Sequence, residues 1–353
     1  MKQLKSTTQK CEGCGGNLIF SPKHQQLYCT KCEKLTNFNK SKAITKHSIA
    51  DAEKSKFNES AWATENKVIA CKTCGAKIVL NNLEYTTNCP YCGSSAVSVT
   101  TELPGMAPDI IIPFAFDEQD AQDKFLVGVK KKMFIPNIFK KKNTEKKIYG
   151  IYIPTFGFDA DTSSNYSGVL IRVESYTGAD GKTYSRDVPF AISGNKKLSH
   201  RDVTIESSSK IDQSQLESIL PYDIKEAYDF DENFIRGYVV EHYNVDGVEC
   251  HKAAKRIIDA NIQRKILSQY SYDKVASLSI KTQYFNEKFL YKVSPIYMFE
   301  FVYKNKTYKP IMNGQTGKLG KGLPKSKIKI TFFVLGIVAI VVAIILLIAF
   351  FGD

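Results

Sequence analysis

Hydrophobic and polar residues alternate along five stretches in the middle of the chain, a pattern typical of half-buried β-strands. The predicted strands cover residues 151–159, 167–176, 184–193, 235–244 and 289–313. Two other stretches, 117–133 and 250–270, carry apolar residues at helical spacing. Residues 179–182 and 246–247 have the Asp-Gly composition of hairpin turns. Residues 100–317 are therefore predicted to form an α+β domain with an antiparallel sheet.

Similar landmarks occur twice in this domain, which suggests an internal duplication. Ile-Pro-Phe at residues 112–114 precedes a charged helical stretch and then a strand-like run at 152–159. Leu-Pro-Tyr at 220–222 likewise precedes a helix and then an alternating run at 295–300. The landmarks of the second copy are further apart because its helix is longer.

A continuous apolar run at residues 330–351 follows this domain and contains no charged residue. At 1.5 Å per residue, a helix of this length reaches about 33 Å, enough to cross a hydrocarbon core of roughly 30 Å. The basic segment 318–329 before it contains Lys318, Lys321, Lys325, Lys327 and Lys329, whereas only Gly352 and Asp353 follow the run. The positive-inside rule therefore predicts a single-pass protein of the cell membrane with a cytoplasmic N-terminus.

Eight of the nine cysteines form four C-x-x-C pairs, and fourteen residues separate the two pairs of each set. Two thiolates on one tight turn and two on a second turn can complete a tetrahedron around a metal ion. The spacing predicts two zinc ribbons, at residues 1–40 and 67–99, joined by a linker at 41–66. The predicted ligands are Cys11, Cys14, Cys29 and Cys32 for one ion and Cys71, Cys74, Cys89 and Cys92 for the other.

We expect both zinc ions to be structural, because four thiolates leave no open position for a catalytic water. Iron in a rubredoxin-like site has similar ligands, and the sequence does not distinguish it from zinc. Gly15, Gly75 and Gly93 follow the second cysteine of their turns, where a residue without Cβ can adopt positive φ, and Glu33 takes this position in the remaining turn. Each ribbon is too small to fold by burial alone, so the metal should contribute most of its folding energy.

Charge and the N-terminal sequence indicate the compartment and the kind of partner. MKQLKSTTQK lacks the apolar segment of a signal peptide, so we expect reduced thiols. The formal net charge of +13 falls to about +9 if each four-thiolate zinc site contributes about −2. This excess favours an acidic partner, such as anionic lipid, nucleic acid or an acidic protein surface.

One basic stretch, residues 130–147, is a candidate for contact with lipid. It places an apolar segment, 133–139, between two clusters of lysines. Such a loop can bind the anionic cytoplasmic leaflet, with each lysine contributing up to about 1 kcal/mol near the surface. The alternative is an ordinary solvated face.

The sequence contains no motif that predicts catalysis. Residues 178–183 and 314–318 resemble a phosphate-binding loop, but two residues separate their glycines where the P-loop has four. The five histidines form no metal-binding or nucleophile pattern. We therefore expect a non-enzymatic protein without a small-molecule substrate, although an enzyme with a dispersed site in the middle domain is a third alternative.

The ribbons, the YIPTFGFDA strand at 152–160, the NGQTGK turn at 313–318 and the C-terminal apolar run together resemble the YdjG-like, TFIIB-type zinc-ribbon membrane proteins of Firmicutes. The resemblance covers nearly the whole chain. It implies a membrane-bound adaptor that recruits cytoplasmic or membrane-associated proteins, such as SPFH-type or PspA-type proteins, in the phage-shock or envelope-stress response. Such proteins are often labelled replication-restart helicase PriA, but this sequence lacks a Walker A loop and the length for two motor domains.

The runner-up function is a membrane-tethered, zinc-dependent nucleic-acid-binding protein. The net charge favours it, as do the zinc ribbons that bind nucleic acid in other proteins. Most aromatic residues, however, lie in the alternating stretches expected to form the core. Binding to random DNA that falls steeply with salt would distinguish this function from the adaptor.

Overall fold

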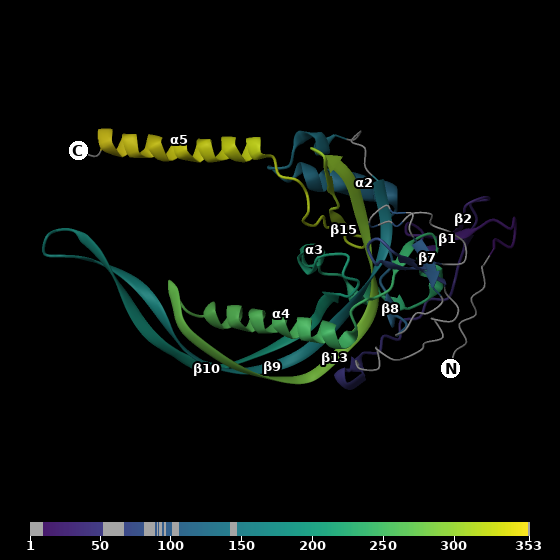
Figure 1. Ribbon diagram of the computed structural model, residues 1–353, viewed down its shortest axis with the longest axis horizontal. Helices are drawn as coiled ribbons and strands as arrows, with labels where there is room; N and C mark the ends of the chain where they lie inside the picture. The colour runs from purple at the N-terminus through teal and green to yellow at the C-terminus, as the bar shows by residue number, and fades with distance from the viewer. Residues whose placement is uncertain are drawn as a thin grey trace.

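The computed structural model describes residues 10–51, 67–80, 89, 91, 94, 97–100, 106–141 and 147–351. Within these residues the protein has an α+β fold built on a twelve-stranded mixed sheet and a separate three-stranded sheet. Four α-helices, α2 to α5, complete the described architecture (Figure 1). Residues 52–66 of the predicted linker, the predicted ligand Cys92, and residues 142–146 of the basic stretch lie outside the described residues.

Two very long strands form the centre of the large sheet. β9 (Lys147–Thr177) and β13 (Lys274–Tyr303) run antiparallel, and β10 (Thr183–Glu206) pairs with the other edge of β9. The three strands continue beyond the core as a curved arm (Figure 1). A turn at residues 178–182 joins β9 to β10, which confirms the hairpin turn predicted there.

Two short strands make the sheet mixed, whereas the sequence predicted an antiparallel one. β8 (Ile110–Ile111) runs parallel to β13, and β12 (Val239–Glu241) runs parallel to β9. The resulting strand order, β8-β13-β9-β12, interleaves two segments that each consist of a short strand, a helix and a long strand. Each short strand therefore lies beside the long strand of the other segment, where it is parallel.

The two segments also agree in register. Ile110 lies seven residues before the helix cap Asp117, and Val239 lies seven residues before the helix cap Asp246. Ile110 is paired with Lys292 in the same parallel arrangement that pairs Val239 with Ile151. In this register residues 112–114 correspond to 241–243, whereas the sequence landmarks matched them to 220–222.

The helices α2 (Glu118–Lys130) and α4 (Gly247–Leu267) overlap the two helices predicted from the sequence. The hairpin turn predicted at 246–247 is wrong, because Asp246 is the N-cap of α4. Its carboxylate accepts the backbone N–H groups of Val248 and Glu249 at 2.9 and 3.0 Å, which satisfies donors that the first turn leaves free. The apolar side of α4 covers one face of the arm with Cys250, Ala254, Ile258, Ile262 and Ile266, all buried.

The strands that carry the second set of cysteines continue the large sheet. β5 (Lys67–Cys71) pairs with β6 (Lys77–Leu80) and β7 (Val97–Thr100). β6 in turn pairs with β12, through Val79 and Val240 and the adjacent residues. This cysteine module therefore shares backbone hydrogen bonds with the centre of the α+β fold.

The first set of cysteines lies on the separate three-stranded sheet. Its strands are β1 (Leu18–Ser21), β2 (Gln26–Cys29) and β3 (Leu35–Thr36). Phe20 of β1 is buried in the main core, with its ring centroid 5.2 Å from that of Phe234. The first module forms a sheet separate from the large one, and Phe20 connects it to the domain through this side-chain packing and through its backbone N–H, which donates to the carbonyl of Arg236 at 3.0 Å.

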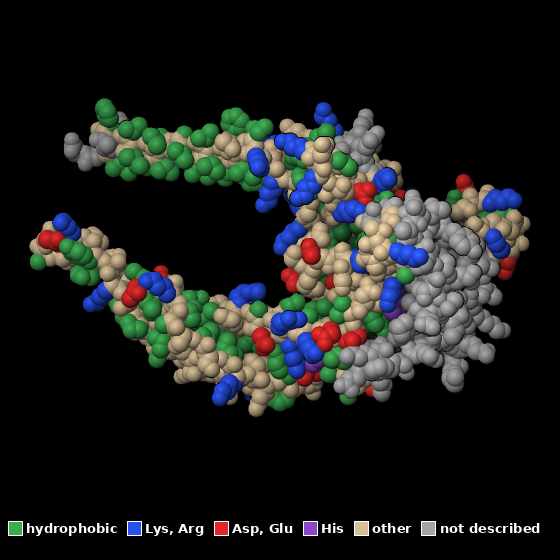
Figure 2. Space-filling view, viewed as in Figure 1, with side chains coloured by type: hydrophobic (Ala, Val, Ile, Leu, Met, Phe, Trp, Pro, Cys, Tyr) green, Lys and Arg blue, Asp and Glu red, His purple; other side chains and the backbone are tan. Residues whose placement is uncertain are grey.

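The C-terminal helix α5 (Lys327–Phe351) extends away from the core of the domain, on the same side as the curved arm (Figure 1). Residues 327–348 are long and apolar enough to cross a membrane, and none of this span is buried against the protein. Hydrophobic side chains cover the visible surface of α5 (Figure 2). The remaining elements are α3 (Gln213–Ile219), β4 (His47–Ser48), β11 (Tyr228–Asp229), β14 (Lys306–Tyr308), β15 (Ile311–Asn313) and 3-10 turns at 137–140, 224–226 and 232–235.

Candidate metal centres

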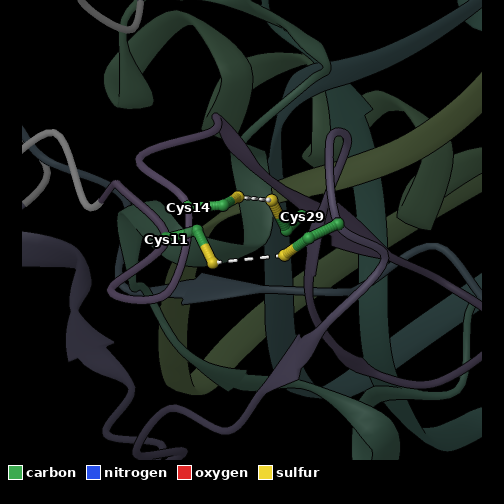
Figure 3. A group of neighbouring side chains, drawn as sticks. Cys11, Cys14 and Cys29 are labelled. Atoms are coloured by element: carbon green, nitrogen blue, oxygen red, sulfur yellow. Dashed lines mark hydrogen bonds between the residues drawn. The ribbon is translucent and has the colours of Figure 1, made fainter.

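Four cysteines of the first module lie together on two turns (Figure 3). The Sγ atoms of Cys11, Cys14, Cys29 and Cys32 are all within 4.8 Å of one another. The distances between Sγ atoms are 3.6 Å for Cys11 and Cys32 and 3.5 Å for Cys14 and Cys29. A tetrahedral zinc ion with Zn–S bonds of about 2.3 Å places its sulfurs roughly 3.8 Å apart, whereas a disulfide bond is about 2.05 Å long. The cluster therefore has the spacing of a metal site.

The same backbone turn carries the three pairs of cysteines that the structure describes in full. The N–H of the first cysteine donates to the carbonyl five residues later, and its carbonyl accepts the N–H four residues later. These two distances are 2.9 and 2.8 Å at Cys11, 3.0 and 3.0 Å at Cys29, and 2.9 and 2.8 Å at Cys71. The fourth residue after each of these cysteines has positive φ: Gly15 at 67°, Glu33 at 61° and Gly75 at 72°.

Glu33→Gly is expected to stabilise the first metal site. A glutamate at positive φ places its Cβ too close to the backbone, at a cost of about 1 kcal/mol or more, and the greater entropy of glycine in the unfolded chain offsets part of the gain. We expect a net stabilisation of roughly 0.5 kcal/mol, measured as slower metal loss to a competing chelator. Gly15→Ala, at the matching position of the other turn, should destabilise the site and make metal loss to the chelator faster. Faster metal loss from the Glu33→Gly protein would contradict this account.

Electrostatics in the first cluster favour a bound cation. The backbone N–H groups of Cys32 and Lys31 lower the pKa of the Cys29 thiol to about 6. The N–H of Lys34 acts in the same direction on Cys32, but hydrogen bonds with the three neighbouring sulfurs raise the pKa of Cys32 to about 12. Four thiolates this close repel one another unless a positive charge lies between them. The donor set therefore fits a divalent metal ion that accepts four sulfurs.

The second cluster has the same arrangement in its described part. The Sγ atoms of Cys71, Cys74 and Cys89 lie within 4.8 Å of one another, and those of Cys74 and Cys89 are 3.6 Å apart. Cys71 and Cys89 are buried. Cys92, the predicted fourth ligand, is not among the described residues. Three sulfurs at this spacing fit one metal ion with a further ligand.

Comparison with known proteins identifies a relative that is similar over nearly its whole length. The chain is 26% identical over 331 residues to the uncharacterized protein YdjG of Bacillus subtilis (strain 168), and the match covers 93% of each protein. No family model matches the chain. No solved structure matches it. The similarity to YdjG agrees with the YdjG-like character predicted from the sequence.

Two distant lysines support the turns of the second cluster. Lys210 Nζ donates to the backbone carbonyl of Cys74, and Lys309 Nζ donates to that of Tyr91. Lys309 also pairs with Glu300, at 2.7 Å. Positive charge beside clustered thiolates stabilises their ionised, metal-binding form. These residues are remote in sequence from the cysteines, and no pattern in the sequence marks them.

Two histidines, His47 and His251, and the turn at 314–318 form hydrogen bonds with other protein groups. Among the described residues, groups of three or more possible metal-binding side chains occur only at the two cysteine clusters. His47 and His251 each contact one carboxylate, Asp109 and Glu287 respectively, at 2.7 Å. Residues 314–318 form a turn, in which Asn313 Oδ1 accepts two backbone N–H groups.

Proposed function

We propose that the protein is a membrane-anchored zinc-ribbon adaptor of the TFIIB-type family, with two structural zinc ions and a non-enzymatic role. The supporting observation is the placement of the two cysteine-bearing sheets and the apolar helix α5 on opposite sides of the described structure (Figure 1). A protein that displays a binding surface away from a membrane needs this separation. The resemblance to YdjG-like proteins suggests SPFH-type and PspA-type proteins as candidate partners.

We further propose that α5 crosses the cell membrane once and that the N-terminal part lies in the cytoplasm. Lysine side chains gather where α5 leaves the folded domain (Figure 2), and such residues favour the cytoplasmic side. The reducing cytoplasm would also keep thiols available for metal. Both arguments support a cytoplasmic position for the cysteine clusters.

The charge of the first module favours protein partners over nucleic acid. Residues 10–40 contain five lysines and two glutamates. A four-thiolate zinc site contributes about −2, so residues 10–40 are nearly neutral when they hold zinc, and Lys2 and Lys5 before them add two positive charges. Binding to nucleic acid requires a concentration of positive charge on the contacting surface. Residues 10–40 by themselves therefore do not carry the charge of a nucleic-acid-binding surface.

We also infer that residues 110–177 and 239–303 are internal copies. The equal spacing from short strand to helix cap and the matching parallel pairings support this duplication. Residues at equivalent positions in α2 and α4 are buried in both helices, as Ala121 and Cys250 show. Duplication would give the domain two related helices, of which α4 lies along the arm.

The proposed function predicts that changes on the exposed surface of the first ribbon remove protein partners. We expect full-length protein captured from membranes to lose its partners when Leu35→Asp and Lys23→Glu are introduced together. Both side chains are exposed, Leu35 at 38%, and neither is a predicted metal ligand. Recovery of SPFH-type and PspA-type proteins is measured by quantitative mass spectrometry, and zinc content is measured in parallel.

A matched variant on the arm, Phe285→Asp with Lys281→Glu, carries the same change in charge and polarity at exposed positions. Partners lost from the ribbon variant but retained by the arm variant would support recognition by the ribbon. Loss only from the arm variant would assign recognition to the arm. Salt-sensitive binding to random DNA, with no protein partner, would replace the adaptor by the nucleic-acid function.

A further inference from the structure

The loop after α2 lies directly against the start of α5. Phe134 and Phe333 are in edge-to-face contact, with ring centroids 5.3 Å apart. The backbone N–H of Ser326 donates to the carbonyl of Phe134 at 2.7 Å. Lys329 Nζ donates to the carbonyl of Ile135 at 2.8 Å and to Asn137 Oδ1 at 2.7 Å. Two segments nearly 200 residues apart in sequence therefore meet where the apolar helix begins.

This contact fixes the depth of the loop, if α5 crosses the membrane as proposed above. Phe333 is the fourth residue of the apolar run 330–351, so it lies within about one helical turn of the edge of the hydrocarbon layer. A ring in contact with Phe333 must lie near the same depth. Phe134 and its neighbours are therefore placed at the level of the lipid headgroups.

The composition of the surface matches that environment. Met133 and Ile138 are 55% and 50% exposed, although both are apolar. Lysines flank them at Lys130, Lys131, Lys132, Lys140 and Lys141. The segments 130–141 and 318–329 contain no aspartate or glutamate. Apolar side chains between lysines suit the boundary between acyl chains and anionic headgroups.

The loop is also held in a defined shape. Ile135 and Phe139 are buried in the main core, and the ring of Phe139 lies 4.4 Å from that of Phe301. Lys132 Nζ donates to the carbonyl of Gly320 at 3.0 Å, which ties the loop to the segment before α5. The exposed residues of this loop therefore face outward from a rigid support.

We propose that residues 130–141 and 318–329 form one headgroup-binding surface for anionic lipid of the cytoplasmic leaflet. This proposal rests on the membrane anchoring proposed above and adds a lipid preference. The surface holds the domain against the membrane at a second place, beside the α5 anchor.

The test uses full-length protein in nanodiscs of phosphatidylcholine alone and in nanodiscs with added phosphatidylglycerol. Hydrogen exchange of the backbone amides at 131–141 is measured by mass spectrometry in both. We expect exchange to slow by about tenfold with the anionic lipid, as about 1.4 kcal/mol of headgroup attraction would give. The triple variant K130Q/K131Q/K141Q should lose this difference, and added salt should reduce it in the unaltered protein.

A matched variant, K182Q/K197Q/K281Q, removes three exposed lysines of the arm and should keep the difference. Equal exchange in the two lipids, or the same loss of protection from both variants, would overturn the headgroup-binding surface. Cosedimentation with vesicles tests the anchor separately. A protein that leaves the vesicles would contradict the membrane anchor itself, whereas one that stays but shows no lipid preference would contradict only this inference.

Discussion

Loss of metal from the second cysteine cluster is expected to unfold the edge of the central sheet, whereas loss from the first should loosen mainly its own ribbon. β6 of the second module pairs with β12, which lies beside β9. Zinc binding to a small ribbon supplies about 10 kcal/mol or more of folding free energy. In the second module that energy also holds a sheet edge in place. C71S/C74S should therefore be the more damaging pair of substitutions.

The two clusters can be compared within one protein. Zinc content should be two ions in the unaltered chain and one in both C11S/C14S and C71S/C74S. In C71S/C74S, hydrogen exchange should accelerate at Val239, Val240 and the paired residues Ile151 and Tyr152. C11S/C14S should leave those amides protected, because the first module forms a separate three-stranded sheet. Equal acceleration in both variants would contradict the structural distinction, and iron in the purified protein would replace zinc as the metal.

Local patterns predicted the features whose causes are local. The seven described cysteines of the eight predicted ligands lie in two clusters, because the ligands of each turn are neighbours in sequence. The apolar C-terminal helix follows from composition alone, although it begins at Lys327, slightly before the predicted start. The helices α2 and α4 and the turn at 178–182 also follow from short-range periodicity and turn chemistry.

Strand length was underestimated where polar residues find partners across the sheet. The sequence predicted separate strands at 151–159 and 167–176. The segment between them includes Asp-Thr-Ser-Ser-Asn at 161–165, which has the composition of a loop. In the structure β9 continues through this segment. Ser164 and Thr282 share a hydrogen bond of 2.9 Å, and Thr162 Oγ1 donates to the carbonyl of Leu198 at 3.1 Å. Such pairing depends on residues more than 30 positions away.

Long-range arrangement left no signal in the sequence. The pairing of β6 with β12 and the support of the second cluster by Lys210 and Lys309 join segments far apart in the chain. The mixed sheet has the same origin, because the interleaved order of the strands makes β8 and β12 parallel to their neighbours. Gly157 is a further example. A larger side chain would not fit at this position, because Lys292 and Asp202, which are distant in sequence, lie directly beside it.

A buried ion pair beside Gly157 leads to the second large prediction. Lys292 of β13 is fully buried, and its Nζ donates to the carboxylate of Asp202 and to Thr204 Oγ1, the latter at 3.0 Å. A Cβ on Gly157 would lie 2.2 Å from Asp202 Oδ1 and 3.0 Å from Lys292 Nζ, so the space around the pair is filled. Asp202→Ala should therefore destabilise the protein by about 3–5 kcal/mol, because it leaves a buried ammonium unpaired.

Asp202 has a φ of 50°, so part of the effect of alanine could come from the backbone. Asparagine tolerates this conformation and keeps a hydrogen-bond acceptor, but it removes the charge. The stability of Asp202→Asn should therefore lie between that of Asp202→Ala and that of the unaltered protein. Lys292→Met should destabilise the protein less than Asp202→Ala does. The Asp202 carboxylate that it leaves unpaired is 20% exposed and can be hydrated. The double variant K292M/D202A should then recover stability relative to D202A. Simple additivity in denaturant unfolding would show that the pair is not coupled.

The pH dependence of Asp202→Ala provides a separate readout of the unpaired lysine. Burial lowers the pKa of Lys292 from its ordinary value of 10.5, while Asp202 acts in the opposite direction. Without Asp202, the pKa of Lys292 in the folded state should fall further, so the folded Asp202→Ala protein loses this proton at a lower pH than the folded unaltered protein does. Stability of Asp202→Ala relative to the unaltered protein should therefore increase with pH between these two folded-state pKa values, both of which lie below 10.5. A constant difference across it would mean that the cost comes from the backbone and packing, since only an unpaired ammonium can be relieved by losing its proton.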